Sequence, residues 1–321
     1  MISVSNNISG SRLKCPIDKS QYGIFFTLVD YRNNYFTSND PERIIEFYDG
    51  FENRDQLIQW MKERPKGASE IHEVDGDKDI IVVIPTADFN GKYARECRDN
   101  IFKGMHMVFV ESGVGNYYFN YAHNCNVGIR KAMEYDPKWV VVSNDDMIKV
   151  DDAANLAILL SKIDENDITV TLAAPDNYHT KAEIVGKTNF LASIFYNRNN
   201  KTRRIWKIKR GFGIVISAAT DSFIARLFFG KHLKIIDIVD FAIFSSCFIK
   251  SNDGNLFDEI FINHFEDSEL SLRIQFENRK TFISSYKIKS VRGGTISEGY
   301  IRDLRTIPSL AYLTEKYRGK F

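Results

Sequence analysis

Four apolar runs recur between positions 79 and 175 of the chain. A continuous apolar run is typical of a strand buried on both faces of a parallel sheet. Segments with a helical pattern lie between consecutive runs, and this alternation indicates βαβ units. The sequence therefore predicts an α/β fold with a mostly parallel sheet flanked by helices. The runs are DIIVVIPT from Asp79, MVFVES from Met107, WVVVSNDD from Trp139 and ITVTLAAP from Ile168.

The N-terminal part of the chain has a different pattern. Residues 23–31 are rich in aromatic and β-branched side chains and predict a strand. Asp40 precedes a proline and begins one helix, and Asn53 is the expected N-cap of a second. Residues 66–78 are polar, contain two glycines and indicate a linker. We therefore expect residues 1–78 to form a small N-terminal α/β appendage with its linker.

Composition and charge limit the kinds of molecule that this protein is expected to bind and the compartment in which it is expected to work. The 321 residues carry 43 Lys+Arg against 42 Asp+Glu, a net charge of +1, so no basic field favours nucleic acid. The four cysteines lie far apart in the sequence without a CxxC pair, which fits reduced thiols in the cytosol. No apolar leader segment is visible, and no stretch reaches the about 20 uncharged apolar residues of a membrane span. A soluble, cytoplasmic protein is the expectation.

The end of the third apolar run carries the first candidate chemistry. Asn144, Asp145 and Asp146 follow the strand directly, and ligands of open α/β sheets bind beyond the carboxyl ends of the strands. Adjacent carboxylates repel each other, and Mg²⁺ or Mn²⁺ relieves the repulsion with oxygen ligands. The alternative is that the two aspartates only cap the helix that begins near Asp151.

A second acidic segment lies far downstream, in FDEIFINHFEDSELSLR. Glu266, Asp267 and Glu269 begin a predicted helix, so they can be capping acids favoured by the helix dipole. Several phenylalanines and isoleucines surround them, and an apolar environment can tune the pKa of a carboxylate for general-base work. Both interpretations stay open from the residues alone.

Together these segments resemble the family 2 glycosyltransferases of GT-A fold. The resemblance covers about residues 79–290, and it rests on four motifs in the same order as in that family. They are IPT at the end of the first strand, the helix segment with Asn126, Gly128 and Ala132, the Asn144-Asp145-Asp146 variant of the D-x-D motif, and the run from Gly254 through Phe257-Asp258-Glu259 and Glu266-Asp267 to Arg273.

The resemblance implies a role for each matching residue. Asp146, with Asp145 beside it, would bind the Mn²⁺ or Mg²⁺ ion that bridges the diphosphate of a nucleotide-sugar, and Asn144 would contact the ribose. Asp267 would be the catalytic base of an inverting transfer to an acceptor hydroxyl, with Glu266 next to it positioning the loop or the acceptor. The remaining nucleotide-sugar-binding positions implied are Pro85, Thr86, Asp88, Glu111, Ser112, Asn126 and Arg273.

The resemblance also implies a division of the main domain. Residues 79–175 would form the Rossmann-like, nucleotide-sugar-binding half and residues 176–295 the acceptor and catalytic half. Residues 296–321 would be a C-terminal tail helix. The chain departs from the family in lacking a late histidine, and Lys289 or Arg292 is the candidate replacement for neutralising phosphate.

Two other functions are alternatives to glycosyl transfer for a sequence with these motifs. A nucleotidyltransferase that makes nucleotide-sugars needs a glycine-rich phosphate loop after the first strand, and IPTADFNG has a single glycine. A non-catalytic sugar- or nucleotide-binding relative would not need Asp146 and Asp267. The proposed acceptor is a glycan, polysaccharide or lipid-linked saccharide. The basic and apolar residues 201–230 offer a peripheral membrane contact as an alternative to a place in the core.

Overall fold

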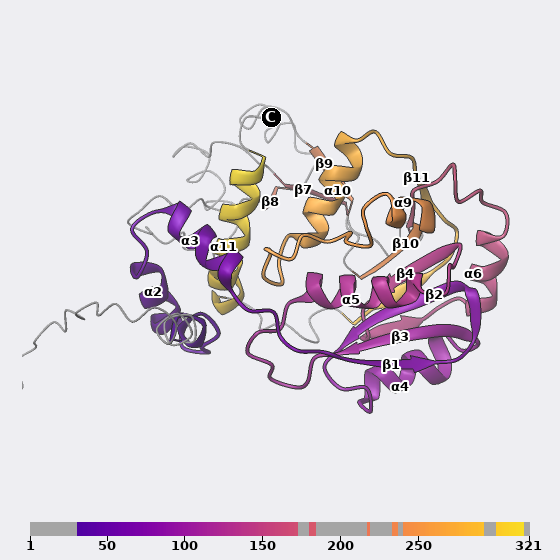
Figure 1. Cartoon of the computed structure of the whole chain (residues 1–321), viewed down its shortest axis with the longest axis horizontal. Helices are drawn as coiled ribbons and strands as arrows, with labels where there is room; N and C mark the ends of the chain where they lie inside the picture. Colours follow the sequence, from indigo (N-terminus) through magenta and orange to yellow (C-terminus); the bar gives the residue numbers. More distant parts are fainter. Residues whose placement is uncertain are drawn as a thin grey trace, which may run out of the picture.

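The computed structural model describes residues 31–172, 180–183, 217–218, 233–236, 240–291 and 300–317 (Figure 1). Within them, seven strands form one central sheet in the order β1-β3-β2-β4-β10-β6-β11. The strands are β1 (Glu70–Val74), β2 (Asp77–Thr86), β3 (Met105–Glu111), β4 (Trp139–Ser143), β6 (Val170–Leu172), β10 (Phe241–Ser245) and β11 (Thr281–Ile283).

The directions of the strands are mixed. β2 is parallel to both β3 and β4, and β11 is parallel to β6. β1 and β10 run antiparallel to their neighbours. The expected α/β fold with a central sheet flanked by helices is confirmed, but the sheet is mixed, with parallel pairing between β2 and its two neighbours and between β6 and β11. The apolar pattern could not reveal the direction of β10, because a central strand is buried on both faces whichever way it runs.

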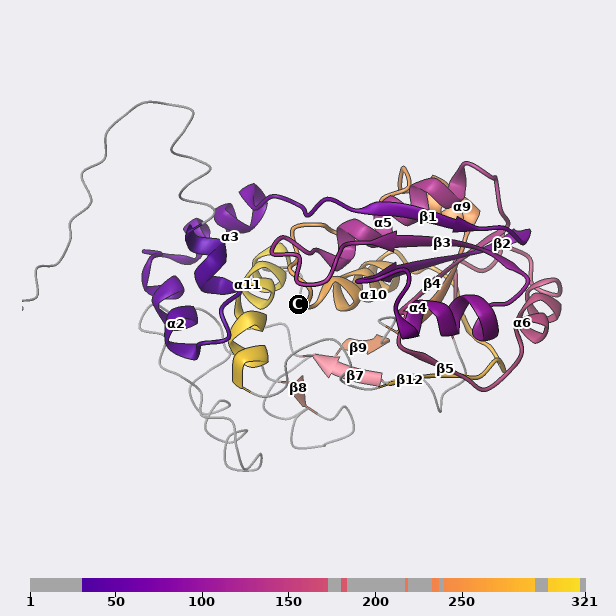
Figure 2. The same ribbon diagram turned by 90° about the horizontal axis from the view of Figure 1, so that it is seen from below.

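Helices cover both faces of the sheet (Figure 2). Alternate side chains of β2 point to opposite faces, so Val82 packs with one set of helices and Val83 with the other. On the first face lie α4 (Lys92–Glu96), the π-helical turn η1 (Cys97–Ile101) and α6 (Ala153–Leu160). On the second face lie α5 (Tyr121–Met133), α9 (Ser246–Lys250) and α10 (Glu266–Phe276).

Gly128 explains how closely α5 approaches the sheet. A Cβ atom at this position would lie 2.3 Å from Val83 Cγ1 and 2.9 Å from Val110 Cγ2, far inside van der Waals contact. Only a residue without a side chain therefore lets this helix rest on β2 and β3. The glycine of the Asn126-Val127-Gly128 segment thus has a packing role.

The N-terminal helices α2 (Pro41–Asp49) and α3 (Arg54–Glu63) pack against the C-terminal helix α11 (Tyr300–Lys316). Figure 1 shows these three helices side by side, beside the sheet. Their shared core is aromatic, with Phe47 and Trp60 at its centre, and the Tyr48 hydroxyl donates to the Leu304 carbonyl over 2.5 Å. The side chains of Asp40 and Asn53 accept from backbone amides at the two helix starts, as expected of N-caps.

Residues 66–78 were expected to be a linker, but residues 70–74 form the edge strand β1. An edge strand with polar side chains lacks the apolar run that marks a central strand, so its pattern resembles that of a loop. The strand expected at 23–31 and the membrane-contact segment 201–230 lie almost wholly outside the described residues. No helix in the described ranges has the length and apolarity to cross a bilayer.

Two smaller sheets complete the described structure. β5 (Met147–Lys149) pairs antiparallel with β12 (Ile288–Ser290), directly after the Asp145-Asp146 pair. β7 (Thr180–Glu183) lies between β8 (Ser217–Ala218) and β9 (Leu233–Ile236). The first of these sheets brings the segment around residue 290 beside the end of β4, where the Val291 amide donates to the Asp146 carbonyl over 2.8 Å.

Candidate active site

Asp145 and Asp146 directly follow β4. They lie at the end of the sheet where its parallel neighbour β2 also ends, and this end is called the site edge below. The Thr86 hydroxyl, from the last residue of β2, donates to Asp145 Oδ2 over 2.7 Å. Asp146 is 6% exposed, and its backbone carbonyl accepts from the amide of Val291, the residue after β12. Parallel neighbours thus bring Thr86 and the two aspartates together, as the strand-end argument predicts.

Asp240 is a third carboxylate at the site edge, and it belongs to none of the motifs from which the site was predicted. It directly precedes β10, whose start lies here because β10 runs antiparallel to β4. Its side chain accepts from Asn144 Nδ2 over 3.2 Å and from Ser290 Oγ over 2.7 Å. An acid at the start of an apolar run was a visible signal, but the direction of the strand was needed to place it.

The electrostatics of the group follow from burial and mutual repulsion. Burial raises the pKa of Asp146 to about 6, and the charges of Asp145 and Asp240 add to the effect. Burial also raises the pKa of Asp145, while the hydrogen bond from Thr86 partly opposes the rise. The ionised form of Asp146 is therefore unfavourable in free energy, and binding of either a proton or a cation would stabilise the group.

Tyr121, at the first position of α5, connects these aspartates with the acidic start of α10. Its hydroxyl donates to Asn144 Oδ1 over 2.9 Å. The pKa of Tyr121 is raised well above its ordinary value by burial, by Cys125, and then by the negative charges of Glu266 and Asp240. Asp240 and Glu266 are therefore both close enough for their charges to act on the same phenol.

Glu266 and Asp267 are both buried, at 6% and 7% exposure. Glu266 Oε2 has no hydrogen-bond partner among the described residues. Burial raises the pKa of Glu266 to about 8, and the charge of Asp267 contributes. The pair therefore divides into a glutamic acid that holds its proton near neutral pH and an aspartate whose charge opposes ionisation of its neighbour.

A constrained loop delivers this pair. Asn263 and Phe265 have φ of 55° and 69°, the left-handed region that a bulky side chain such as Phe265 rarely occupies. Two asparagine side chains join this loop to the start of α5, one from the loop and one from the N-cap of the helix. Asn263 Oδ1 accepts from the Tyr121 amide over 2.8 Å, and Asn120 Nδ2 donates to the carbonyls of Glu259 and Phe261 over 3.0 and 2.8 Å. Contacts of this kind compensate for backbone strain at functional sites.

Asn126, which the resemblance assigns to the nucleotide-sugar, uses its side chain within the protein. Its Nδ2 donates to the Phe257 carbonyl over 2.8 Å and to Glu259 Oε1 over 3.0 Å, and its Oδ1 accepts from the Phe257 amide over 3.0 Å. Although burial alone would raise the pKa of Glu259, the hydrogen bonds from Asn126 and His123 lower it. Asn126 therefore positions the segment that leads to the acids of α10.

The resemblance also assigns Arg273 to the nucleotide-sugar, and its side chain likewise forms its contacts within the protein. Its guanidinium donates to Asn252 Oδ1 over 2.9 Å and to the Leu256 carbonyl, and its Nε lies 3.6 Å from Glu269 Oε1. Lys316 of α11 bridges Glu269 and Asp258, at 2.8 and 2.7 Å. These two motif carboxylates are thus neutralised inside the fold, unlike the Glu266 carboxylate.

The remaining expected nucleoside contacts lie at the ends of β2 and β3. Pro85 is buried within β2, Asp88 is exposed in the loop that follows, and Ser112 donates its amide to the Thr86 carbonyl over 2.9 Å. The Glu111 carboxylate instead accepts from His72 of β1, with 2.7 Å between Oε2 and Nε2. Lys289 is exposed in β12, and Arg292 lies outside the described residues.

The fold also contains a polar cavity away from these acids. It has a volume of about 610 Å³, and its lining includes Asn166, Thr169 and Lys280. The Thr169 carbonyl accepts from Ser245, the last residue of β10, so the cavity lies at the opposite end of the sheet from Asp240. It adjoins none of the candidate residues.

Comparison with known proteins adds no assignment. No protein-family model matches the sequence, and no curated protein matches it significantly. A function for this chain therefore has to be argued from its motifs and from the geometry of the site.

The role of Asn126 can be tested by comparing two asparagines of α5. Asn126→Ala should lower the free energy of unfolding by about 2 kcal/mol or more, because it leaves the buried amide and carbonyl of Phe257 without partners. Asn124→Ala is the matched control, since Asn124 is equally buried but its Nδ2 has no hydrogen-bond partner within the described ranges. Urea unfolding of both variants gives the comparison. Equal losses of stability would contradict the positioning role.

The buried state of Glu266 predicts a dependence of stability on pH. The folded protein holds a proton on Glu266 that the unfolded chain loses, between its ordinary pKa of 4.5 and about 8. The free energy of unfolding contributed by this group therefore falls as pH rises through that window. Glu266→Gln should flatten the slope measured by urea unfolding with a metal chelator present, and Glu277→Gln, an exposed change just beyond the same helix, should not. A wild-type slope in Glu266→Gln would refute the assignment.

Proposed function

We propose that this protein is an inverting, metal-assisted glycosyltransferase that moves a sugar from a nucleotide-diphospho-sugar to an acceptor hydroxyl. The observation that carries the proposal is the position of Tyr121, which donates to Asn144 after β4 and is close enough to Asp240 and Glu266 for their charges to raise its pKa. The order of motifs that resembles the family 2 glycosyltransferases supports the same activity. The two lines of support are independent, since one is sequence order and the other is spatial proximity.

The donor set at the end of β4 suits a hard divalent cation. Asp145 and Asp146, with Asp240 beside them, supply carboxylate oxygens, which Mg²⁺ and Mn²⁺ prefer. Burial and, after it, the repulsion from Asp145 and Asp240 raise the pKa of Asp146, and a cation in place of the proton would relieve that repulsion. Asp146 and Asp145 would hold the ion, and when bound it would stabilise the negative charge of the leaving diphosphate.

The nucleoside of the donor would lie over the ends of β2 and β3. Thr86, Asp88 and Ser112 offer polar groups there, with Pro85 in the wall beneath them. Asn144, held between Tyr121 and Asp240, would present its amide to the ribose. Glu111 is left out of this donor site, because its carboxylate is turned to His72 on the edge strand.

Asp267 would act as the general base. The raised pKa of the neighbouring Glu266 favours its neutral form, so Glu266 would not place a second negative charge beside the base. Asp267 would take the proton of the acceptor hydroxyl as that oxygen attacks the anomeric carbon. The bond to the diphosphate breaks on the opposite side, which inverts the anomeric centre. Glu266 would hold the loop or the acceptor by a hydrogen bond.

The loop after β2 argues against the nucleotidyltransferase alternative. It contains one glycine, Gly91, and leads into α4, which has only five residues. A glycine-rich cradle at the start of a longer helix is what binding of a nucleoside triphosphate requires. A cytoplasmic reaction on a glycan, polysaccharide or lipid-linked acceptor belongs to the same proposal.

Two substitutions test the roles separately. Asp146→Asn should abolish the Mn²⁺-dependent part of nucleoside diphosphate binding, measured by calorimetry over a panel of nucleoside diphosphates. Asp267→Asn should keep that binding but lower kcat for sugar transfer by at least about 10²-fold, because a positioned carboxylate typically contributes about 10²–10⁴-fold to such proton transfers.

Asp79→Asn is the matched control, since Asp79 is an exposed aspartate near the opposite end of β2. It should leave both binding and kcat unchanged. Wild-type metal-dependent affinity in Asp146→Asn would remove the metal assignment. Full transfer activity in Asp267→Asn would show that Asp267 is only a helix-capping acid, for which asparagine is nearly as good.

A further inference from the structure

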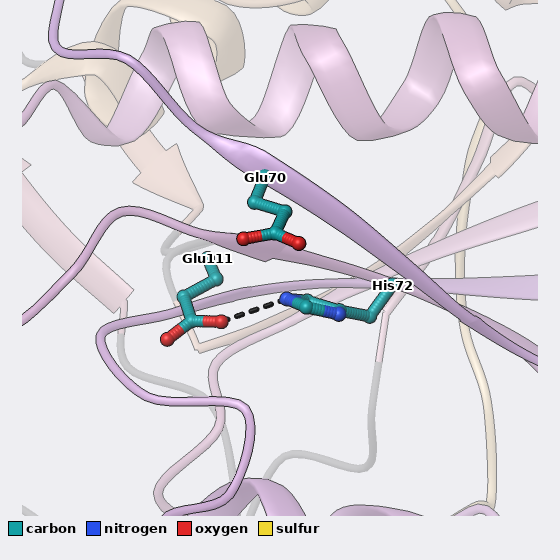
Figure 3. Close-up of side chains that lie close together, drawn as sticks. All are labelled: Glu70, His72 and Glu111. Carbon is teal, nitrogen blue, oxygen red and sulfur yellow. Dashed lines mark hydrogen bonds and ion pairs between the residues drawn. The ribbon is translucent and has the colours of Figure 1, made fainter.

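Three side chains of the kinds that can ligate a metal lie close together on the outermost strand, β1, and its neighbour β3. Glu70 and His72 are two residues apart on β1, so they lie on the same face. In the antiparallel register, Glu111 of β3 lies directly opposite Glu70. One ligand atom from each side chain lies within 4.8 Å of the other two, and in the described structure this is the one such group of three (Figure 3).

The charges of this cluster are unbalanced. Two carboxylates directly opposite each other in an antiparallel pair destabilise the ladder. His72 shares a single hydrogen bond with Glu111, and no described lysine or arginine pairs with Glu70 or Glu111. Glu73, on the other face of β1, differs because Lys131 lies 3.2 Å from its Oε1. A cation is therefore already supplied on one face of the strand and missing on the other.

The imidazole of His72 is held in place. It stacks on the ring of Phe89 with 4.3 Å between centroids and 7° between planes. The guanidinium of Arg98 lies 4.5 Å from the centroid of the same Phe89 ring and packs against it. The stack directs Nε2 of His72 toward Glu111, so the ligand nitrogen faces the carboxylates.

We propose that Glu70, His72 and Glu111 bind a transition-metal ion of the Zn²⁺ class. One imidazole nitrogen with two carboxylates is a ligand set for zinc, and three protein ligands leave a fourth position for water. Tetrahedral ligands at about 2.0–2.2 Å from zinc are about 3.4 Å apart. The 2.7 Å contact between His72 and Glu111 has to open slightly and the widest separation of up to 4.8 Å has to close, which side-chain rotation can supply.

The bound ion would join the edge strand to β3 next to the proposed donor site. Glu111 precedes Ser112, and Ser112 is hydrogen-bonded to Thr86, the partner of Asp145. The ion would thereby fix the end of β3. The inference does not rest on the proposed glycosyl transfer, because it uses none of the residues assigned to metal, donor or base in that proposal.

Calorimetric titration of the full chain with Zn²⁺ alone tests the site. Wild-type protein should bind one ion at this site, and Glu70→Gln, His72→Gln and Glu111→Gln should each weaken its affinity by at least tenfold. Glu73→Gln, a change of the same type on the opposite face of β1, should alter it less than twofold. Glu70 is exposed, so its variant removes a ligand without disturbing the core even where a His72 change impairs folding.

A second pair of measurements distinguishes this proposed zinc site from the aspartates that follow β4. Asp146→Asn should keep the zinc affinity, and His72→Gln should keep the Mn²⁺-dependent binding of nucleoside diphosphate. Absence of zinc binding in wild-type protein, wild-type affinity in Glu70→Gln, or loss of the zinc site in Asp146→Asn would each overturn the inference. None of these results would bear on the transferase proposal, which fails only through its own variants.

Discussion

The cost of holding several carboxylates together at one sheet edge is the constraint on which the site depends. Asp145, Asp146 and Asp240 lie along that edge, close enough for the charges of Asp145 and Asp240 to act on Asp146, and burial disfavours the charged forms of Asp145, Asp146 and the more distant Glu266. Proteins rarely keep such a group without a proton or a cation to balance it. The raised pKa values of Asp146 and Glu266 reflect the free energy needed to keep these groups charged. The proposed metal ion would lower that free energy at Asp146.

The surrounding fold keeps these acids in place mainly through amides. Asn120, Asn126 and Asn263 join the start of α5 to the segment that leads into α10. Neutral hydrogen-bonding groups position a backbone without adding charge, so the electrostatics of the acids are left to the acids themselves. Lys316 of α11 neutralises the neighbouring Asp258 and Glu269, whereas none of the described lysines and arginines forms an ion pair with Glu266.

Much of the fold could be predicted from the sequence, because burial on two faces leaves an unmistakable apolar run. β2, β3, β4 and the caps of α2 and α3 follow from such local rules. β1 could not be predicted, since a polar edge strand has no apolar pattern. Asp240 was missed for a related reason, because its place depends on the antiparallel direction of β10, which no local pattern encodes.

The candidate site shows a second limit. A motif residue has the same letter whether its side chain meets a ligand or the protein's own backbone. Asn126 and Arg273 belong to the motifs, yet their polar atoms hold residues 252–259 in place. The zinc-type cluster at β1 was invisible for the opposite reason, because Glu111 lies far along the chain from Glu70 and only the register of β1 on β3 brings them together.

The central claim is that the aspartates of β4 and the acidic start of α10 face one ligand. Paramagnetic broadening by Mn²⁺, with Mg²⁺ as the diamagnetic reference, tests it directly in amide NMR spectra of the full chain with a nucleoside diphosphate. The account predicts that the amides of Tyr121, Asp240 and Asp267 broaden together, while those of Asn166 and Lys280 at the opposite end of the sheet stay sharp. Broadening around Asp146 that leaves Tyr121 and Asp267 unaffected would contradict it.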